Sequence, residues 1–429
     1  MTIKEVLMKL NTSDFDTVLA DLYGESSVSV QKERFKKAAE TFRDAFPEAE
    51  EKDISIFSAP GRTEICGNHT DHQHGRVLAA AVDLDAVAIV ALNGKNAICL
   101  QSEGYPRIEV DLGDISPREE EKGTTAALIR GTAAQFKWLG TSVGGFDAYV
   151  TSSVLSGSGL SSSAAFEVMI GKVTDCLFNG GKAGNEEIAK FGQIAENTYF
   201  GKACGLMDQM VSAVGGLVEI DFQYPSSPKI DVHQCNLDRF GFSLVITDTK
   251  GSHADLSEEY SAIPKEMRSV ARFFGKNNLR DVDEKEFYAR INSLKRDPGI
   301  TDRAILRSAH FFDDDARVGK EAEALDKEDI KTFLNLVNES GRSSETLLQN
   351  LFNPSSPKTQ DIPLALLLSR KVLGKEGACR VHGGGFAGTI QAFVPKDKVR
   401  EYIETLEGAF GKGSCHILQI RSTGAVQLV

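Results

Sequence analysis

A glycine- and serine-rich stretch at residues 153–165, Ser-Val-Leu-Ser-Gly-Ser-Gly-Leu-Ser-Ser-Ser-Ala-Ala, has residue types that suit contact with phosphate. Glycines let a backbone approach a ligand closely, and serines are good N-caps for the helix predicted from about residue 162. Backbone N–H groups that converge at a helix N-terminus form a phosphate site. A capped, flexible loop explains the same composition without a ligand. The chain contains no Gly-Lys-Ser or Gly-Lys-Thr, so a Walker-type loop is excluded.

A second stretch concentrates polar side chains within a few residues. Arg62 follows an Ala-Pro-Gly run, and residues 67–75 read Gly-Asn-His-Thr-Asp-His-Gln-His-Gly. A polyhydroxylated ligand needs many directional donors and acceptors, and Asp71 has two oxygens that can accept from vicinal hydroxyls. The histidines of this stretch and Asp71 are also residue types that bind metals. A metal site is not favoured, because neighbouring side chains in so short and turn-rich a segment point in different directions. A solvated loop is the plainest alternative.

Two carboxylates lie on neighbouring predicted helices. Asp208 belongs to Cys-Gly-Leu-Met-Asp-Gln-Met at 204–210, where Leu206, Met207 and Met210 form an apolar helical face around it. Glu196 lies upstream on the preceding helix and faces either solvent or a cation. An acid in such surroundings either has a structural role as a cap or takes part in chemistry. Neither Asp208 nor Glu196 alone distinguishes these two possibilities.

A glycine-rich segment at 382–388, His-Gly-Gly-Gly-Phe-Ala-Gly, formally satisfies Gly-x-Gly-x-x-Gly. We reject a dinucleotide-binding interpretation, because no helix with an acidic partner follows and residues 389–394 predict a strand.

The elements around these stretches predict a mixed α and β protein. Phe35, Ala38 and Phe42 recur at helical spacing within a charged segment, so a helical extension is expected over residues 1–53. Short apolar runs predict strands at 54–57, 86–90, 97–100, 146–154, 217–222 and 243–248, and helices are expected at 124–139, 162–178, 185–200 and between 258 and 351. A Pro-Ser-Ser-Pro turn at 225–228 indicates a boundary between two domains, 1–222 and 223–429.

Composition narrows the class of partner. The formal net charge of −12 disfavours nucleic acid and anionic membranes. No apolar run approaches the roughly 20 residues of a membrane span, and residues 1–10 lack the apolar core of a secretory signal. The 7 cysteines are scattered without a Cys-x-x-Cys pair, which indicates reduced thiols. We therefore expect a cytoplasmic protein with a small-molecule partner.

Taken in order, the four stretches resemble the galactokinase branch of the GHMP kinases (galacto-, homoserine, mevalonate and phosphomevalonate kinases). That branch shows Gly-Arg and Gly-Glu-His-Thr-Asp-Tyr-Asn-x-Gly, then Gly-Leu-Ser-Ser-Ser-Ala, Cys-Gly-x-Met-Asp-Gln and Gly-Gly-Gly-Phe-Gly-Gly. The resemblance runs from about residue 57 onward and implies an α+β, two-lobed GHMP kinase-like fold, with mixed sheets, helices and an active site between the lobes. It implies a galactokinase that uses ATP and Mg²⁺ and is a monomer or weak oligomer.

The resemblance also implies residue roles. Asp208 matches the catalytic aspartate near the anomeric hydroxyl, and Arg62 matches the arginine that stabilises charge beside it. The matching sugar contacts are Asn68, His69, Asp71, His72, Gly205 and Tyr260. The matching ATP-binding loop is Gly157, Ser158, Gly159, Leu160, Ser161, Ser162, Ser163 and Ala164. Ser162 or Ser163, together with Glu196, would hold Mg²⁺, a hard cation that prefers oxygen ligands.

Two departures from the family pattern concern the substrate. The family's glutamate before His-Thr-Asp is Asn68 here, and the following Tyr-Asn is His72-Gln73, a pattern similar to plant galacturonate kinases. Asn68 removes a negative charge where a C6 carboxylate would lie. Galactose is the expected substrate, and galacturonate or another C6-modified sugar is the alternative. A third hypothesis is a non-catalytic sensor of sugar and ATP. The intact Ser-Ser-Ser-Ala at 161–164 argues against it.

Overall fold

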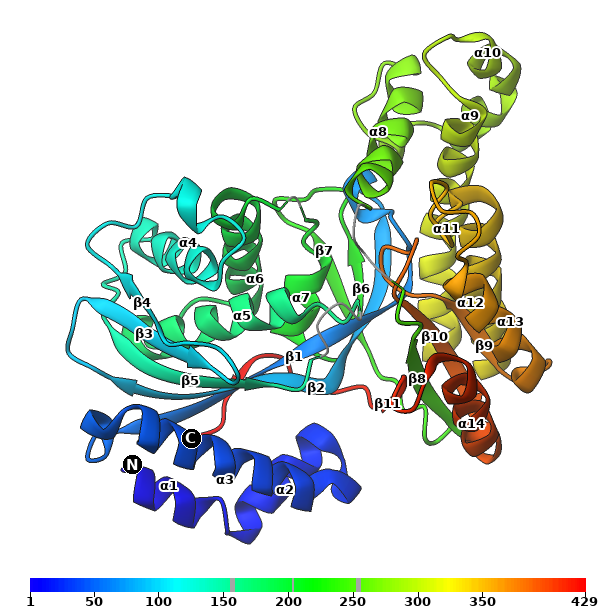
Figure 1. Cartoon of the computed structure of the whole chain (residues 1–429). Coiled ribbons are helices and arrows are strands. Elements are labelled where there is room, and N and C mark those ends of the chain that lie inside the picture. The colour runs from blue at the N-terminus through cyan, green and yellow to red at the C-terminus, as the bar shows by residue number, and fades with distance from the viewer. Residues whose placement is uncertain (155–158, 203, 252–255) are drawn as a thin grey trace.

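A computed structural model describes residues 1–154, 159–202, 204–251 and 256–429. Its larger sheet has the strand order β12-β1-β2-β5-β3-β4, with β6 paired to the far end of β2 and β7 paired to β6 (Figure 1). All pairs are antiparallel except β3 with β5. The bounds are β1 (Ile54–Cys66), β2 (Arg76–Leu92), β3 (Ala97–Ser102), β4 (Ile108–Asp111), β5 (Phe146–Ser152), β6 (Leu217–Asp221), β7 (Lys229–His233) and β12 (Val426–Gln427).

Helices cover both faces of this sheet (Figure 1). One face packs on α1 (Ile3–Lys9), α2 (Ser13–Tyr23) and α3 (Val28–Ala45), and the other on α4 (Thr125–Trp138), α5 (Ser162–Thr174), α6 (Asn185–Ile194) and α7 (Met207–Val214). Strand β2 shows why: Val87 and Ile89 join the core with α1–α3, whereas Ala88 and Val90 join the other core. Side chains along a strand point alternately to the two faces of the sheet, so a strand that is apolar at every position is buried on both faces.

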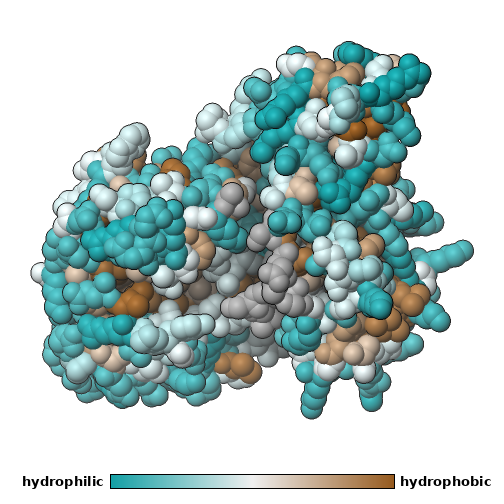
Figure 2. Space-filling view, turned by 45° about the horizontal axis from the view of Figure 1, so that its top comes forward, coloured by the Kyte–Doolittle hydropathy of each residue, from teal (hydrophilic) through white to brown (hydrophobic). Residues whose placement is uncertain are grey.

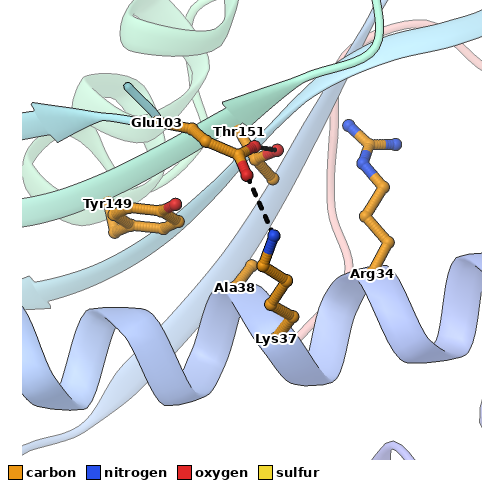
Figure 3. A pocket seen from close by; sticks show the side chains of 6 residues that line it. All are labelled: Arg34, Lys37, Ala38, Glu103, Tyr149 and Thr151. Atoms are coloured by element: carbon orange, nitrogen blue, oxygen red, sulfur yellow. Dashed lines mark hydrogen bonds and ion pairs between the residues drawn. The ribbon is translucent and has the colours of Figure 1, made fainter. Parts of the chain in front are cut away.

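The N-terminal helices are tied to the sheet by a buried carboxylate. Asp85 accepts hydrogen bonds from Tyr23 Oη at 2.5 Å, from Ser58 Oγ, and from Arg34 at 2.7 Å. Beside it, α3 and β5 border a half-open pocket of about 200 Å³ that is lined by Arg34, Lys37, Ala38, Glu103, Tyr149 and Thr151 (Figure 3). Lys37 pairs with Glu103 and Arg34 with Asp85, so the charges beside this pocket are balanced within the protein.

The smaller sheet is antiparallel, in the order β11-β8-β10-β9: β8 (Phe242–Asp248), β9 (Ala378–Val381), β10 (Thr389–Pro395) and β11 (Cys415–Leu418). The helices around it are α8 (Ser257–Phe273), α9 (Glu284–Ala289), α10 (Ile291–Arg296), α11 (Asp302–Asp326), α12 (Ile330–Ser343), α13 (Asp361–Leu373) and α14 (Val399–Phe410). The glycine-rich segment at 382–388 is a turn between β9 and β10. A strand follows it, which agrees with the rejection of a dinucleotide site.

The C-terminal residues return to the larger sheet. Phe57 on β1 pairs with Gln427, and Arg421 reaches the buried Asp85 at 3.2 Å. The last residues of the chain thus pack with the first half of the protein. The expected domains, 1–222 and 223–429, placed these residues in the second half. The surface is hollowed between the half that carries α4 and the half that carries α8 (Figure 2). No helix in the described part of the chain is long and apolar enough to cross a membrane.

Candidate active site

Arg62 and Asp208 meet from elements that are far apart in the sequence. Arg62 Nε donates to Asp208 Oδ1 at 2.7 Å, and a terminal guanidinium nitrogen lies 2.6 Å from the same oxygen. Asp208 belongs to the first turn of α7, and Arg62 lies on β1. The strand expected at 54–57 continues to Cys66, because a bulge between Pro60 and Arg62 lets it run through the Pro-Gly pair.

The predicted phosphate loop is bound to this pair. Ser161 Oγ donates to Asp208 Oδ2 at 2.6 Å, and the Arg62 guanidinium donates to the Gly159 carbonyl. The Arg62 backbone N–H also donates to Leu160 O at 3.0 Å. Ser161 has φ 60, a left-handed conformation immediately before α5 begins. The structure therefore places loop, arginine and aspartate together, at the N-terminus of a helix that favours anions.

Of the eight residues expected in that loop, Ser162, Ser163 and Ala164 form the first turn of α5. Gly157 and Ser158 lie outside the described residues.

The expected cation site lies behind the loop. Ser163 Oγ donates to Glu196 Oε1 at 3.1 Å, whereas Ser162 occupies the same helical turn. Gln209 Nε2 donates to Glu196 Oε2 and to Glu167 Oε2, both at 3.0 Å. Glu196 lies in the helical segment Ala195–Phe200 that continues α6, and it is buried. Of the three expected ligands, Ser163 and Glu196 are therefore in contact, and Glu167 is a second carboxylate beside them.

Glu167 was missed from the sequence, where it is an isolated acid in the apolar run of α5. Burial and the charge of Glu196 raise the pKa of its carboxyl to about 9. Its Oε1 and the Oε1 of Gln209 are buried and have no hydrogen-bond partner among the described residues. Ser163 and Glu196 are oxygen ligands of the kind that Mg²⁺ takes, and the unpaired amide oxygen of Gln209 lies beside them, so these residues fit Mg²⁺. No group of three or more His, Cys, Asp or Glu able to hold a metal occurs in the described ranges.

Asp71 faces the catalytic pair from the loop between β1 and β2. Burial and the nearby charge of Asp208 raise the pKa of its carboxyl to about 6, although the His72 backbone N–H donates to Oδ1 at 2.8 Å. Gly205 lies directly against it, since a Cβ at that position would be 1.9 Å from Asp71 Oδ2. Asp71, Gly205 and Asp208 are therefore neighbours, as their predicted roles require.

Three more expected sugar contacts are His69 and His72 on the same loop and Tyr260 on α8, and two of them bond to the glycine turn at 382–388. His69 Nε2 lies 3.0 Å from Gly384 O, and Tyr260 Oη donates to Gly385 O at 2.9 Å. The His69 and His72 ring centroids are 5.6 Å apart. Burial lowers the pKa of His69 to about 4 and lowers the pKa of His72 well below its usual range. Both imidazoles are therefore neutral at pH 7.

Asn68 is placed differently from its neighbours in the loop. It is fully buried, and its Nδ2 donates to Glu64 Oε1 at 2.8 Å and to Gly383 O at 2.7 Å. Its Oδ1 accepts from Asn350 Nδ2 at 2.8 Å. The amide is thus used within the protein. Its contact with a sugar stays a prediction, and such a contact would require one of these bonds to exchange.

His382 is a further residue that the sequence did not single out from its glycine turn. The Glu64 backbone N–H donates to Nε2 at 3.3 Å, so the ring proton is assigned to Nδ1, which lies 3.0 Å from Thr389 Oγ1. A Cβ at Gly159 would be 3.1 Å from His382 Nδ1. The imidazole therefore packs between β1 and the predicted phosphate loop.

Two protein-family models match parts of this chain. The galactokinase galactose-binding signature matches residues 40–92, which include β1, the Asp71 loop and β2. The GHMP kinases N terminal domain matches residues 127–216, from α4 to the end of α7.

Solved structures share the fold over most of their length. Lactococcus lactis galactokinase, solved with galactose, has a TM-score of 0.77 and 22% identity, over 91% of this chain and 99% of that chain. Methanococcus jannaschii mevalonate kinase has a TM-score of 0.60 and 16% identity, over 86% and 99% of the two chains. A D-glycero-D-manno-heptose 1-phosphate kinase from Bacteroides thetaiotaomicron has a TM-score of 0.59 and 16% identity, over 88% and 99%.

The α+β fold is therefore that of the GHMP kinases, and the matched domain defines a phosphotransferase that acts on a hydroxyl group. The galactose-binding signature confirms the resemblance to the galactokinase branch.

Proposed function

We propose that this protein is an ATP-dependent sugar 1-kinase that converts galactose and ATP to galactose 1-phosphate and ADP. The observation that carries the proposal is the position of the Asp208 carboxylate, one oxygen of which bonds Arg62 and the other Ser161 of the loop. A hydroxyl that donates to this carboxylate would lie beside phosphates held at the N-terminus of α5. Phosphoryl transfer needs mainly such alignment and charge neutralisation.

Each part of the site has a role in this reaction. The sugar oxygen bonds to the γ-phosphorus as the bond from phosphorus to the ADP oxygen breaks, and Asp208 accepts first the hydrogen bond and then the proton of the attacking hydroxyl. Arg62 balances the charge that develops on the phosphoryl oxygens. Ser163 and Glu196 would hold Mg²⁺, which neutralises phosphate charge when bound. Asp71 would orient the sugar by accepting from its hydroxyls.

The substrate has a second candidate, a sugar with a C6 carboxylate. The replacement of the family's glutamate by Asn68 favours it, because a carboxylate at that position would repel a uronic acid. Against it, Glu64 lies 2.8 Å from the Asn68 amide, so a carboxylate remains nearby, although Arg380 neutralises it at 3.0 Å. Galactose therefore stays the first choice. The cytoplasmic location and the monomeric or weakly oligomeric state stay predictions, and the 7 free cysteines fit a reducing compartment.

The test is turnover of the purified protein with MgATP and a panel that includes galactose, galacturonate and other hexoses. Phosphorus NMR identifies the phosphorylated position, and kcat/KM ranks the sugars. We expect a sugar 1-phosphate, and we expect Asp208→Asn to lower kcat by orders of magnitude while the sugar still binds. Phosphate on another hydroxyl, or near-native turnover of Asp208→Asn, would overturn the proposal. A higher kcat/KM for galacturonate would replace galactose by the second candidate.

A further inference from the structure

Lys202 lies at the entrance of the expected cation site. Its Nζ is 3.1 Å from Glu196 Oε1, and its backbone N–H donates to the Glu196 carbonyl, also at 3.1 Å. The lysine side chain is 63% exposed, whereas that of Glu196 is 3% exposed. A solvent-exposed lysine therefore reaches a buried carboxylate from outside and is anchored to the same residue through its backbone.

The oxygen that Lys202 contacts is also the one that bonds Ser163, the other expected metal ligand. The ammonium and the Ser163 hydroxyl therefore share Glu196 Oε1. The opposite oxygen is engaged by Gln209. Behind it, the buried Oε1 atoms of Glu167 and Gln209 have no hydrogen-bond partner among the described residues. The ammonium of Lys202 thus balances the charge of the buried Glu196 carboxylate.

We propose that Lys202 occupies the cation position in the nucleotide-free protein and competes with the divalent cation for Glu196 Oε1. The inference rests on the proposed function for the identity of this site. An ammonium on a flexible, exposed stem moves aside at little cost, because its charge returns to water. Lys202 would then set how much free metal the protein needs, without touching the reacting atoms.

Metal affinity of the nucleotide-free protein tests this directly, with Mn²⁺ as the probe and its free concentration measured by electron paramagnetic resonance. Removing a competitor that holds the site most of the time raises the apparent affinity by about five-fold, so Lys202→Met should bind Mn²⁺ about five-fold more tightly than the native protein. Lys202→Arg keeps the competing charge and should stay near the native value. Lys182→Met, at an exposed position, is the matched control and should change nothing.

An unchanged or weaker Mn²⁺ affinity in Lys202→Met would overturn the inference. So would native Mn²⁺ binding by Glu196→Gln, because the probe would then lie elsewhere. In turnover assays, Lys202→Met should lower the Mg²⁺ concentration for half-maximal rate. If the affinity rises but no sugar is phosphorylated, the competition stands and the proposed function fails. If sugars are phosphorylated while the Mn²⁺ affinity is unchanged, the proposed function stands and the competition by Lys202 fails.

Discussion

Asp71 is the residue whose charge state should be visible in the kinetics. Its carboxyl has a pKa of about 6, and it lies against Gly205 beside the catalytic pair. As pH falls through 6 the carboxylate is protonated, and it loses the charge that makes hydrogen bonds from sugar hydroxyls strong. We therefore expect kcat/KM for the sugar at pH 5 to be about a tenth of its value at pH 8. The measurement is kcat/KM from pH 5 to 8 at saturating MgATP.

The control is Asp71→Asn, which keeps the shape of the side chain but does not titrate. Its kcat/KM should be low and should show no fall near pH 6. If this variant retained the acid limb of the native protein, the limb would belong to another group and the assignment of Asp71 would fail.

The sequence located most of the site at this scale because its residues lie in short, distinctive stretches. Arg62, Asp71, Gly205 and Asp208 do come together. Asn68 shows the limit, since residue type alone does not tell whether an amide faces a ligand or is used by buried partners such as Glu64 and Asn350. That choice is made by residues far along the chain.

At the scale of elements, helices α1–α3 form one wall of the core. They bury the face of the larger sheet that carries Val87 and Ile89, and Tyr23 brings α2 into contact with Asp85. Because the sheet is apolar on both faces, this extension is part of the fold. From the sequence, the spacing of Phe35 and Phe42 predicted a buried helical face but did not indicate which element it packs on. The structure shows that this face packs on the larger sheet.

Tyr23→Phe should therefore destabilise the protein and leave its kinetics unchanged. The substitution removes a buried hydrogen bond to a charged group, for which a loss of about 1.5–3 kcal/mol is typical. Urea denaturation measures the free energy of unfolding, and kcat/KM for the sugar reports on the site. Tyr105→Phe, at a side chain that is 70% exposed, is the control and should change neither. Equal stability of Tyr23→Phe and the native protein would show that Tyr23 does not secure the extension.

Strands and helices with strong periodicity were predicted close to their observed bounds, including α4, α5 and β8. The strands expected at 54–57 and 86–90 are shorter than β1 and β2, and the pairing of the chain end with β1 was missed. Strand β12 has only two residues, and its pairing with β1 is set by residues about 370 positions away. No local pattern carries that information.

At the scale of the whole molecule, His233 connects the larger sheet to the longest helix. It lies on β7, with Nδ1 2.9 Å from Asp326 at the end of α11 and Nε2 3.6 Å from Glu219 on β6. These carboxylates raise the pKa of His233 to about 9. In the unfolded chain the pKa returns to about 6.5.

This shift makes the connection stabilising below pH 6.5, where the imidazole is charged in both states. As pH rises from 6.5 to 9 the unfolded chain loses the proton first and the stabilisation declines, and above 9 it is lost. Solvent screening limits it to about 1 kcal/mol, or about 1 °C in Tm for a chain of 429 residues. His233→Gln retains a donor for Asp326 but carries no charge. Its Tm should therefore lie below the native value at pH 6 and converge with it near pH 10, so that the difference between the two proteins isolates His233 from all other titrating groups. A difference that stays constant from pH 6 to 10 would mean that this ion pair does not hold the sheet and the helix together.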